Sequence, residues 1–398
     1  NIVTKLDYNV QSIIEKCILE YNGEKPSKNT AVVVADPSNG EILGMASYPT
    51  FNLNDPRKLT GMYTDEEIKD MSDEEYRNNL YSLWTNYCVS ESYEPGSTFK
   101  PVTVASALEE GVVKDGDTYV CKGFETVADY KLKCHVFSTI GSHGSLTVEQ
   151  ALMNSCNPYM IHLALEMGNS RFAYYQSLFG FGKTTGVDLP GETTGIVYGD
   201  RMTTIDAACN SFGQTINVNM MQMMAAYCSI INGGMLYQPH IVKRIESANG
   251  EVVKEYKANL VRQTITASTS KLLRRYLKNT VEEGTAKKAG VTGYSVAGKT
   301  GTAQKGDRKD NKWIISFIGH APAENPKFAI YVVIDEPYGT TGTSGSSADV
   351  LTLTHNILEK LLPYMNVYKD ASDEYEDTSS SPDELTVDGI PAGTASSN

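Results

Sequence analysis

The first residues able to do chemistry are a serine and a lysine three positions apart, Ser97 and Lys100. A Pro-Gly break precedes them, and a helical run follows as far as Gly111, so Ser97 is predicted at a helix N-terminus. Lys100 then lies on the same face, with the two Cβ atoms roughly 5–6 Å apart. A protein can activate a hydroxyl nucleophile by placing it beside an amine and free backbone N–H groups. Alone, the same pattern also fits a serine N-cap with an exposed lysine.

A second polar pair, Ser155 and Asn157, flanks Cys156 directly before Pro158. The segment follows a helical stretch and sits at a break, which would expose both polar side chains. An ordinary N-cap turn has the same composition, so this pattern is also ambiguous alone.

A third segment, residues 297–304, is a strand-like stretch of small residues that contains Lys299, Thr300, Gly301 and Thr302. Small side chains let another backbone or a substrate approach closely, although a glycine-rich edge strand looks the same. A phosphate-binding loop is excluded, because the Gly-x-x-x-x-Gly-Lys-Ser/Thr pattern is absent.

The gross composition limits the function classes. A length of 398 residues allows one large domain or two ordinary ones. The formal net charge of −13 argues against a nucleic-acid partner. No apolar run approaches the ~18 residues of a transmembrane helix. Because the chain opens on Asn1-Ile2-Val3 without methionine, we expect that an N-terminal segment has been removed. The 7 cysteines follow no disulfide framework and leave the redox compartment open.

The elements that must position these segments suggest an α+β fold. Apolar periodicity predicts helices at 9–21, 147–154, 158–167, 171–179, 203–209, 219–232, 268–283 and 347–362, and strands at 31–36, 41–49, 294–304, 313–321 and 327–335. Short links join the late strands, so we expect an antiparallel five-stranded sheet flanked by helices (an α/β sandwich), with a mostly helical subdomain. Residues 1–365 would form this domain. Residues 366–398 are acidic and rich in serine and proline, which predicts a disordered linker or tail.

Taken together, the ordered motifs S-x-x-K, S-x-N and K-T-G resemble the active-site set of penicillin-binding proteins and serine β-lactamases. The resemblance covers residues 1–365 and is closest to class B penicillin-binding proteins, the monofunctional D,D-transpeptidases, of the elongation or sporulation type. Further matches are EPGSTFKP (94–101), FGFGKTTGVDLPGE (179–192), GQTINV (213–218) and KTGTAQ (299–304). The resemblance implies the penicilloyl-serine transferase fold, which is β-lactamase- and transpeptidase-like.

The resemblance also implies roles for the motif residues. Ser97 would attack the penultimate D-alanine of a D-Ala-D-Ala stem peptide, with Lys100 as its base. Lys299 would be the second cation that lowers the pKa of Lys100. Ser155 would relay a proton to the leaving amine, and Asn157 would hold Lys100 and the substrate amide. The substrate strand would contain Thr300, Gly301 and Thr302: the two threonines would contact the terminal carboxylate, and the backbone N–H groups of Ser97 and Thr302 would form the oxyanion hole.

The same resemblance implies partners and a location. The partners would be peptidoglycan stem peptides as donor and amine acceptor, β-lactam antibiotics, and a membrane glycosyltransferase, and catalysis would need no cofactor. The enzyme would act at the extracytoplasmic face of the bacterial cell membrane, anchored by an N-terminal segment. A serine β-lactamase and a β-lactam-sensor domain are the alternatives. The segment 179–192 resembles the transpeptidase pattern rather than a hydrolytic loop, and Glu192 is interpreted as structural.

A possible metal site lies in the loop-rich stretch 121–156. Its candidate ligands are Cys121, Cys134, His143 and Cys156, and three thiolates with one imidazole suit tetrahedral Zn²⁺. His135 and Asp129 are alternate ligands. Some elongation-type relatives carry zinc in the matching region, which supports a structural zinc that holds the Ser155–Asn157 turn. A Cys121–Cys134 disulfide and plain buried thiols remain open as alternatives.

Overall fold

The computed structural model describes residues 1–59, 63–306, 310, 312–337 and 346–369. Across these ranges, no helix combines the length and the apolar character that crossing a membrane requires. The tail predicted from residue 366 lies outside the described residues, except for residues 366–369.

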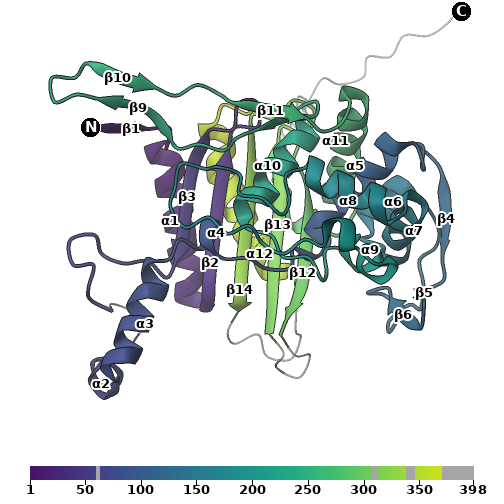
Figure 1. Cartoon of the computed structure of the whole chain (residues 1–398), viewed down its shortest axis with the longest axis horizontal. Helices are drawn as coiled ribbons and strands as arrows, with labels where there is room; N and C mark the ends of the chain where they lie inside the picture. The colour runs from purple at the N-terminus through teal and green to yellow at the C-terminus, as the bar shows by residue number, and fades with distance from the viewer. Residues whose placement is uncertain (60–62, 307–309, 311, 338–345, 370–398) are drawn as a thin grey trace, which may run out of the picture.

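A five-stranded sheet forms the centre of the molecule (Figure 1). Its strands, in spatial order, are β12 (Ala297–Lys305), β13 (Lys312–Ala321), β14 (Phe328–Pro337), β2 (Ser27–Ala35) and β3 (Ile42–Tyr48). All neighbouring pairs are antiparallel. The predicted five-stranded antiparallel sheet is therefore confirmed, and the strand that carries Lys299 lies at its edge.

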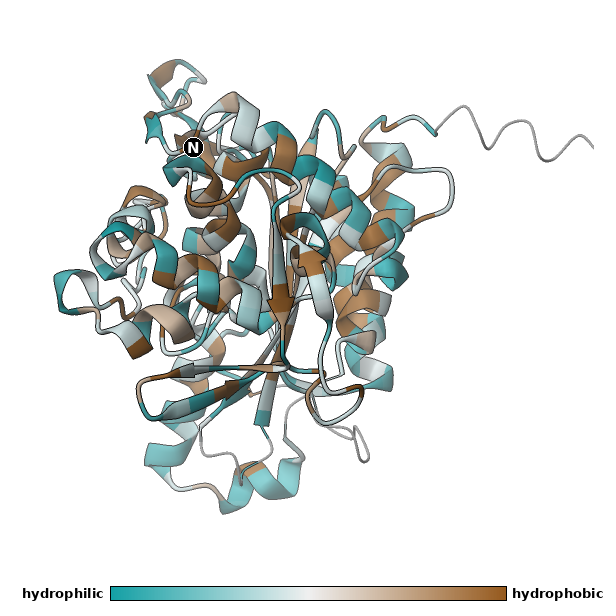
Figure 2. Ribbon diagram, turned by 90° about the vertical axis from the view of Figure 1, so that its right-hand side faces the viewer, coloured by the Kyte–Doolittle hydropathy of each residue, from teal (hydrophilic) through white to brown (hydrophobic). Residues whose placement is uncertain are grey.

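Both faces of the sheet are buried, which makes the fold a sandwich. Alternate residues of β2 contribute to two separate apolar clusters: Val32 and Val34 to one, Ala31 and Val33 to the other. The first cluster is shared with α1 (Tyr8–Glu24) and α12 (Ala348–Tyr364). Figure 2 shows the apolar strands seen edge-on between the helices on either side. This two-sided burial explains why β2 reads as the continuous run Ala-Val-Val-Val-Ala rather than as an alternating pattern.

The second face of the sheet packs against the helical subdomain. Its helices are α5 (Lys100–Glu110), α6 (Val148–Met153), α7 (Asn157–Met167), α8 (Asn169–Leu178), α9 (Thr204–Asn210), α10 (Met220–Ile231) and α11 (Ala267–Glu282). Every residue of α10 is buried, as expected of a helix that is apolar on all sides. This subdomain lies beside β12, the edge strand that carries Lys299 (Figure 1).

Several short elements complete the fold. The segment 50–92 forms α2 (Asp65–Asp70), α3 (Asp73–Trp84) and α4 (Tyr87–Ser90). The segment 112–146 contains the short strands β4 (Thr118–Cys121), β5 (Phe124–Val127), β6 (Tyr130–Lys133) and β7 (Gly144–Thr147). The sequence reasoning missed β1 (Ile2–Thr4), β8 (Met235–Tyr237), β9 (Val242–Glu246), β10 (Val252–Glu255) and β11 (Leu260–Gln263). No residue of β10 is buried, so it carries no period-two apolar pattern by which a sequence could reveal it.

One histidine in the sheet is buried without a charged partner. His320 of β13 is fully buried, with Nδ1 2.9 Å from the Tyr227 hydroxyl and Nε2 3.1 Å from the Ala323 carbonyl oxygen. A neutral imidazole satisfies both contacts, accepting at Nδ1 and donating at Nε2. Burial lowers the pKa of His320 to about 3.

Candidate active site

Ser97 lies in a short 3₁₀ helix, η1 (Gly96–Phe99), which runs directly into α5 at Lys100. The predicted position of Ser97 at a helix N-terminus is where the structure places it. Gly301 of β12 permits this placement: a Cβ atom there would lie 2.4 Å from Ser316 Oγ and 2.9 Å from the carbonyl oxygen of Pro95. Only glycine lets the residues before Ser97 rest against the sheet edge at this point.

Ser155 occupies the turn between α6 and α7. Its φ is +55°, a left-handed conformation that is uncommon for a residue with a side chain. This turn directs its hydroxyl towards Ser97, with the two Oγ atoms 3.0 Å apart. Asn157 begins α7, and its Nδ2 donates to the Lys133 carbonyl oxygen at 3.3 Å.

Two buried lysines converge on the Ser155 hydroxyl. Lys100 Nζ donates to Ser155 Oγ at 3.0 Å, to the Ser155 carbonyl oxygen at 2.6 Å and to Asn157 Oδ1 at 2.7 Å. Lys299 Nζ donates to Ser155 Oγ at 3.0 Å and to the Thr300 carbonyl oxygen at 3.1 Å. The structure therefore brings together Ser97, Lys100, Ser155, Asn157 and Lys299, which are up to about 200 residues apart in the sequence.

Burial disfavours the charged form of both lysines. It lowers the pKa of the Lys100 ammonium to about 8. It holds the pKa of Lys299 well below its usual range, and repulsion from Lys100 lowers that pKa further. A neutral amine and a proton donor can therefore both exist in the site near neutral pH, which suits general acid–base chemistry.

The connection between Ser97 and Lys100 differs from the direct contact that the sequence motif suggests. The described side chains contain no direct hydrogen bond between them. Instead, Ser155 Oγ lies 3.0 Å from both Ser97 Oγ and Lys100 Nζ, so it links the two groups. The three donor positions of Lys100 are directed to Ser155 and Asn157.

The edge of β12 completes the site. Gly96 approaches the Thr302 backbone so closely that a Cβ at residue 96 would lie 2.6 Å from the Thr302 oxygen. Thr300 Oγ1 lies 3.4 Å from Thr285 Oγ1, and the Thr285 side chain is exposed at this edge. Sequence reasoning missed Thr285, because only the fold brings residues 284–286 next to the strand.

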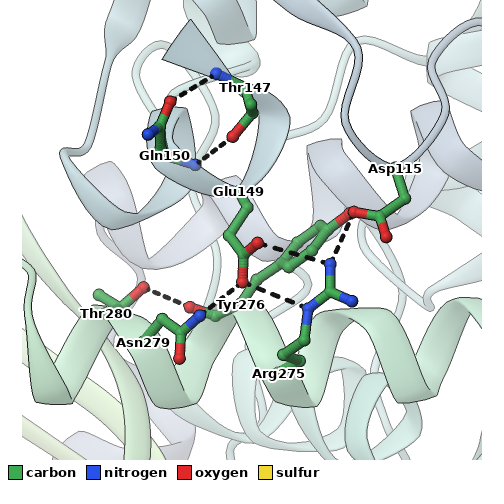
Figure 3. A network of polar contacts seen from close by, with 8 residues as sticks. All are labelled: Asp115, Thr147, Glu149, Gln150, Arg275, Tyr276, Asn279 and Thr280. Carbon is green, nitrogen blue, oxygen red and sulfur yellow. Dashed lines mark hydrogen bonds and ion pairs between the residues drawn. The ribbon is translucent and has the colours of Figure 1, made fainter.

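A polar network fixes the helix that carries the Ser155 turn (Figure 3). Glu149 of α6 accepts from Asn279 at 2.6 Å and from Arg275 at 3.3 Å, both on α11. Arg275 also donates to Asp115 at 2.6 Å. The Thr147–Gln150 capping box closes the start of the same helix. These contacts hold α6, and thus the position of Ser155, without touching the site; the sequence alone gave no sign of them.

The Cys/His cluster beside the site is also assembled. The ligand atoms of Cys121, Cys134, His143 and Cys156 all lie within 4.8 Å of one another. Their spacing is compatible with one tetrahedral ion, whose Zn–S and Zn–N bonds measure about 2.0–2.3 Å. The alternates do not belong to this group: His135 Nε2 is 2.9 Å from the Asn154 carbonyl oxygen, and Asp129 is exposed. All seven cysteines are free thiols, so the alternative Cys121–Cys134 disulfide is not formed.

The thiols of the cluster are electrostatically coupled. A hydrogen bond from the Cys156 thiol lowers the pKa of Cys134 to about 3, and the same hydrogen bond, with burial, raises the pKa of Cys156. A thiolate is thus available at Cys134, which is the form that a metal ion binds. Cys156 is at the same time the middle residue of the Ser155–Asn157 turn.

The Glu192 carboxylate hydrogen-bonds to two residues of its own loop. Its carboxylate accepts from the Thr185 backbone N–H at 2.6 Å, the Thr185 hydroxyl at 2.7 Å and the Gly186 N–H at 3.0 Å. These three bonds fold the 185–192 loop. Glu192 therefore acts as a structural residue of that loop, as interpreted from the sequence.

The chain matches the family described as "Penicillin binding protein transpeptidase domain" over residues 30–359. The chain belongs to this penicillin-binding protein transpeptidase family. Stage V sporulation protein D of Bacillus subtilis (strain 168) is 37% identical over 368 residues, which cover 91% of this chain and 53% of that protein. Peptidoglycan D,D-transpeptidase FtsI of Escherichia coli (strain K12) is 29% identical, covering 93% of this chain and 57% of that protein. The chain thus spans about half the length of these curated relatives.

Solved transpeptidase structures have the same architecture. Penicillin binding protein 3 from Mycobacterium tuberculosis, complexed with ampicillin, is 27% identical with a TM-score of 0.78, covering 93% of this chain and 79% of that chain. The transpeptidase domain of Burkholderia pseudomallei penicillin-binding protein 3 is 24% identical with a TM-score of 0.74, covering 92% of this chain and 97% of that chain. The expected class B penicillin-binding protein family and penicilloyl-serine transferase fold are therefore confirmed.

Proposed function

We propose that this transpeptidase-family domain is a serine D,D-transpeptidase that cross-links peptidoglycan stem peptides and is acylated by β-lactams at Ser97. One observation carries the proposal: Ser155 Oγ lies 3.0 Å from Ser97 Oγ and 3.0 Å from each of two buried lysine amines. A nucleophile, a proton relay and two amines in contact with one another are the components of acyl transfer without a cofactor.

In the first step Ser97 Oγ attacks the carbonyl carbon of the penultimate D-alanine. Its proton moves to Ser155 Oγ while the Ser155 proton moves to neutral Lys100, along the two 3.0 Å contacts. The backbone N–H groups of Ser97 and Thr302 stabilise the tetrahedral oxyanion. When the peptide bond breaks, the terminal D-alanine takes a proton through Ser155 and leaves as the free amine. The acyl group then remains on Ser97 as an ester.

The donor peptide has a defined direction in this scheme. Its terminal carboxylate is bound by Lys299 and by the hydroxyl groups of Thr300 and Thr302. The incoming carboxylate favours the charged form of Lys299, and that charge in turn favours the neutral form of Lys100. Because β12 is an edge strand, the donor adds to it as an antiparallel strand. The residues before the scissile bond therefore run towards Lys305, the C-terminal end of β12.

In the second step the amine of another stem peptide attacks the ester carbonyl. Its nitrogen loses a proton through Ser155, Ser97 Oγ regains one, and the new peptide bond joins the two stems. Hydrolysis by water would need a positioned carboxylate base. Glu192, at the end of the segment 179–192 that would correspond to a hydrolytic loop, is occupied by three hydrogen bonds within its own loop, which favours the transpeptidase over a β-lactamase.

Labelling with a fluorescent penicillin tests the nucleophile. Wild-type protein is expected to become labelled, and Ser97→Ala is expected to remain unlabelled. Ser82→Ala, an exposed serine of α3 outside the proposed proton path, is the matched control and should label like wild type. An intact-mass increase of one penicillin per chain locates a stable acyl-enzyme. Equal labelling of wild type and Ser97→Ala would rule out the assignment.

Turnover separates the alternatives. A transpeptidase is expected to open the ring of roughly one equivalent of nitrocefin per enzyme in a burst, with the opened product retained as the Ser97 ester, whereas a β-lactamase would hydrolyse and release it over many turnovers. A β-lactam sensor would form the same stable adduct, but it would not join a D-Ala-D-Ala donor to an amine acceptor. Release of D-alanine together with a cross-linked dipeptide product is therefore the result that supports the enzyme.

The location and partner follow from the same chemistry. The stem peptides lie outside the cytoplasmic membrane, so the domain is proposed to act at the extracytoplasmic face, held there by a membrane anchor. A glycosyltransferase that polymerises the glycan strands would supply its substrate. A co-purification of the full-length protein from membranes, with and without detergent, would test both statements.

We also propose that Cys121, Cys134, His143 and Cys156 hold a structural Zn²⁺. The support is the donor set: four ligand atoms within 4.8 Å of one another, three of them buried thiols. Such an ion would supply a rigid crosslink between the β4–β7 region and the Ser155–Asn157 turn, and it would take no part in the reaction. Closed structural zinc sites of this type contribute directly to the free energy of folding.

Metal analysis tests the zinc proposal. Protein purified without added zinc is expected to contain about one zinc per chain, and Cys156→Ser is expected to contain much less. Cys209→Ser, a half-buried cysteine outside the cluster, is the matched control and should retain the metal. Equally metal-free wild type and variants, purified without chelators, would contradict the proposal.

A further inference from the structure

A junction of buried hydroxyl groups lies beneath the nucleophile. Its members, each at most 5% exposed, are Tyr331 of β14, Ser316 of β13, Tyr93 and Thr98. Building on the proposed transpeptidase function, we propose that the Tyr331 hydroxyl is a positioning group for the oxyanion hole. It acts through Thr98 and Ser316, and it thereby sets the separation of the two backbone N–H groups that would stabilise the oxyanion.

The Tyr331 hydroxyl is the centre of the junction. It accepts a hydrogen bond from the Tyr93 hydroxyl at 2.9 Å, and the Thr98 hydroxyl lies 3.5 Å away. Ser316 is a third hydrogen-bonding partner. Thr98 Oγ1 donates its own proton to the Pro95 carbonyl oxygen at 2.7 Å, so the longer contact takes its proton from Tyr331. Because a hydroxyl has one proton and two acceptor positions, these three partners use its full capacity.

The junction lies where the turn that contains Ser97 meets the edge strand β12. A Cβ atom at Gly301 would lie 2.4 Å from Ser316 Oγ and 2.9 Å from Thr98 Cγ2. Thr98 directly follows Ser97 in the chain, and Gly301 directly precedes Thr302. Both residues that would form the oxyanion hole are therefore one peptide unit away from a residue that contacts the junction.

The sheet connects Tyr331 to this point across three strands. Tyr331 lies on β14, the middle strand of the five, and pairs with Ile318 of β13 (Figure 1). Ser316 is two residues before Ile318 and pairs with Gly301 of β12. Residues two apart on a strand point to the same face, so Tyr331 and Ser316 share the face that packs against the helical subdomain. The hydroxyl thus joins the centre of the sheet to the turn that carries the nucleophile.

Loss of the Tyr331 hydroxyl would disturb the turn rather than only weaken the fold. The Tyr93 proton would lose its acceptor in a buried space, which favours a local shift that restores a hydrogen bond. An oxyanion hole works only when its donors lie about 2.7–3.1 Å from the developing charge. A misplacement of about 1 Å can slow a reaction by about a hundredfold. The acylation step, rather than the binding of substrate, is therefore the quantity that depends on Tyr331.

Tyr331→Phe tests the inference, because it keeps the ring and removes only the hydroxyl. Stopped-flow fluorescence separates penicillin acylation into the dissociation constant of the non-covalent complex and a first-order acylation rate. The first-order rate is expected to fall at least about tenfold, while the dissociation constant stays within about twofold. Tyr227→Phe is the matched control. It removes another buried hydroxyl, which lies 2.9 Å from His320 Nδ1, and should acylate like wild type.

The ester carbonyl of the acyl-enzyme reports on the oxyanion hole directly. With carbon-13 at the β-lactam carbonyl, isotope-edited infrared spectra isolate its stretching band, and hydrogen bonds from the hole lower the frequency of that band. The band is expected at higher frequency in Tyr331→Phe than in wild type, and at the wild-type frequency in Tyr227→Phe. A merely structural loss would lower the urea midpoint of both variants and leave both bands in place.

Thr98→Val examines the same contact from the other side, and it serves if Tyr331→Phe does not fold. It keeps the shape of the side chain and removes the hydroxyl through which Tyr331 acts, so acylation should slow and the carbonyl band should rise. Thr98→Ser keeps the hydroxyl and should restore both towards wild type. The effects of Thr98→Val and Tyr331→Phe on the first-order rate should be less than additive, because both remove the same connection.

The outcomes separate this inference from the function on which it rests. Wild-type protein that is labelled at Ser97, together with a Tyr331→Phe variant of unchanged rate or unchanged carbonyl band, overturns the positioning role and leaves the transpeptidase proposal standing. Fully additive effects of the substitutions at Tyr331 and Thr98, or an equal loss of rate in Tyr227→Phe, also overturn it. Wild-type protein that penicillin does not label refutes the proposed function itself.

Discussion

Replacing Ser155 tests whether the path from Ser97 to Lys100 passes through its hydroxyl. Ser155→Ala removes an oxygen that lies 3.0 Å from Ser97 Oγ, Lys100 Nζ and Lys299 Nζ. Lys100 keeps two acceptors, at 2.6 and 2.7 Å, whereas Lys299 keeps the Thr300 carbonyl oxygen at 3.1 Å and a long contact at 3.5 Å. The principal loss is therefore the proton relay, and a positioned acid–base group contributes about 10²–10⁴-fold. We expect acylation by penicillin to slow by that factor, about 3–5 kcal/mol in the barrier.

Ser155→Gly separates the hydroxyl from the strained backbone. At φ +55° a residue with a Cβ costs about 1–2 kcal/mol relative to glycine. Both variants lack the hydroxyl, so their acylation rates should agree within about threefold. In urea unfolding, Ser155→Gly should be about 1 kcal/mol more stable than Ser155→Ala.

The assay is the second-order rate constant of penicillin acylation, followed by stopped-flow fluorescence or by intact mass. A Ser155 variant that keeps more than a tenth of the wild-type rate would refute the relay, because Ser97 would then reach Lys100 by another route. A Ser155→Gly variant less stable than Ser155→Ala would refute the assignment of backbone strain at this turn.

Three further predictions follow from the same contacts. Lys299→Ala should reduce the rate of acylation at least a hundredfold. Lys183→Ala should leave that rate unchanged, because Lys183 belongs to a Lys-Thr-Thr-Gly run that resembles the K-T-G motif in sequence only. Equal effects of the two variants would contradict the assignment of Lys299 to the K-T-G motif. Gly301→Ala should slow acylation at least tenfold, because the new Cβ displaces the helix that carries the nucleophile. Gly23→Ala, where no atom lies within 4 Å of the new Cβ, should not slow it. Because burial lowers the folded-state pKa of His320 to about 3, against about 6.5 when unfolded, its contribution to stability is complete above pH 6.5 and is lost as the pH falls towards 3. Between pH 7 and pH 5 wild-type protein should therefore lose about 2 kcal/mol that His320→Asn does not lose, and parallel losses in urea unfolding would contradict this.

Local patterns predicted most of the long elements. The all-apolar run of α10 predicted a buried helix, and the Ala-Val-Val-Val-Ala run of β2 predicted a strand, because each pattern reflects burial on both sides. The strands between Met235 and Gln263 were missed, since Leu236 alone among their residues is buried and β9 pairs with β1 at the start of the chain. Pairing of this kind leaves no trace in a short window of sequence.

The site was predicted in its residues but not in its connections. The sequence order of the three motifs pointed to Ser97, Lys100, Ser155, Asn157 and Lys299, and the structure connects them through hydrogen bonds around the Ser155 hydroxyl and the Lys100 amine. The roles of these residues remain proposals. Sequence spacing suggested a direct Ser97–Lys100 contact, whereas the fold inserts the Ser155 hydroxyl between them. The α6–α11 network that fixes this turn consists of polar residues whose types carry no signal of their own.

The sequence by itself determined which groups are available: a serine at a helix N-terminus, two lysines, small residues on an edge strand, and four soft ligands in one loop-rich stretch. Helix caps, glycines and apolar periodicity are local, so the chain specifies them over a few residues. Only the tertiary structure decided what these groups do to one another. It desolvates the two lysines, inserts Ser155 between nucleophile and amine, and packs Gly301 against the residues before Ser97. Those properties depend on distances and burial between segments that lie far apart in the sequence, and such distances exist only once the sheet and the helical subdomain have packed together.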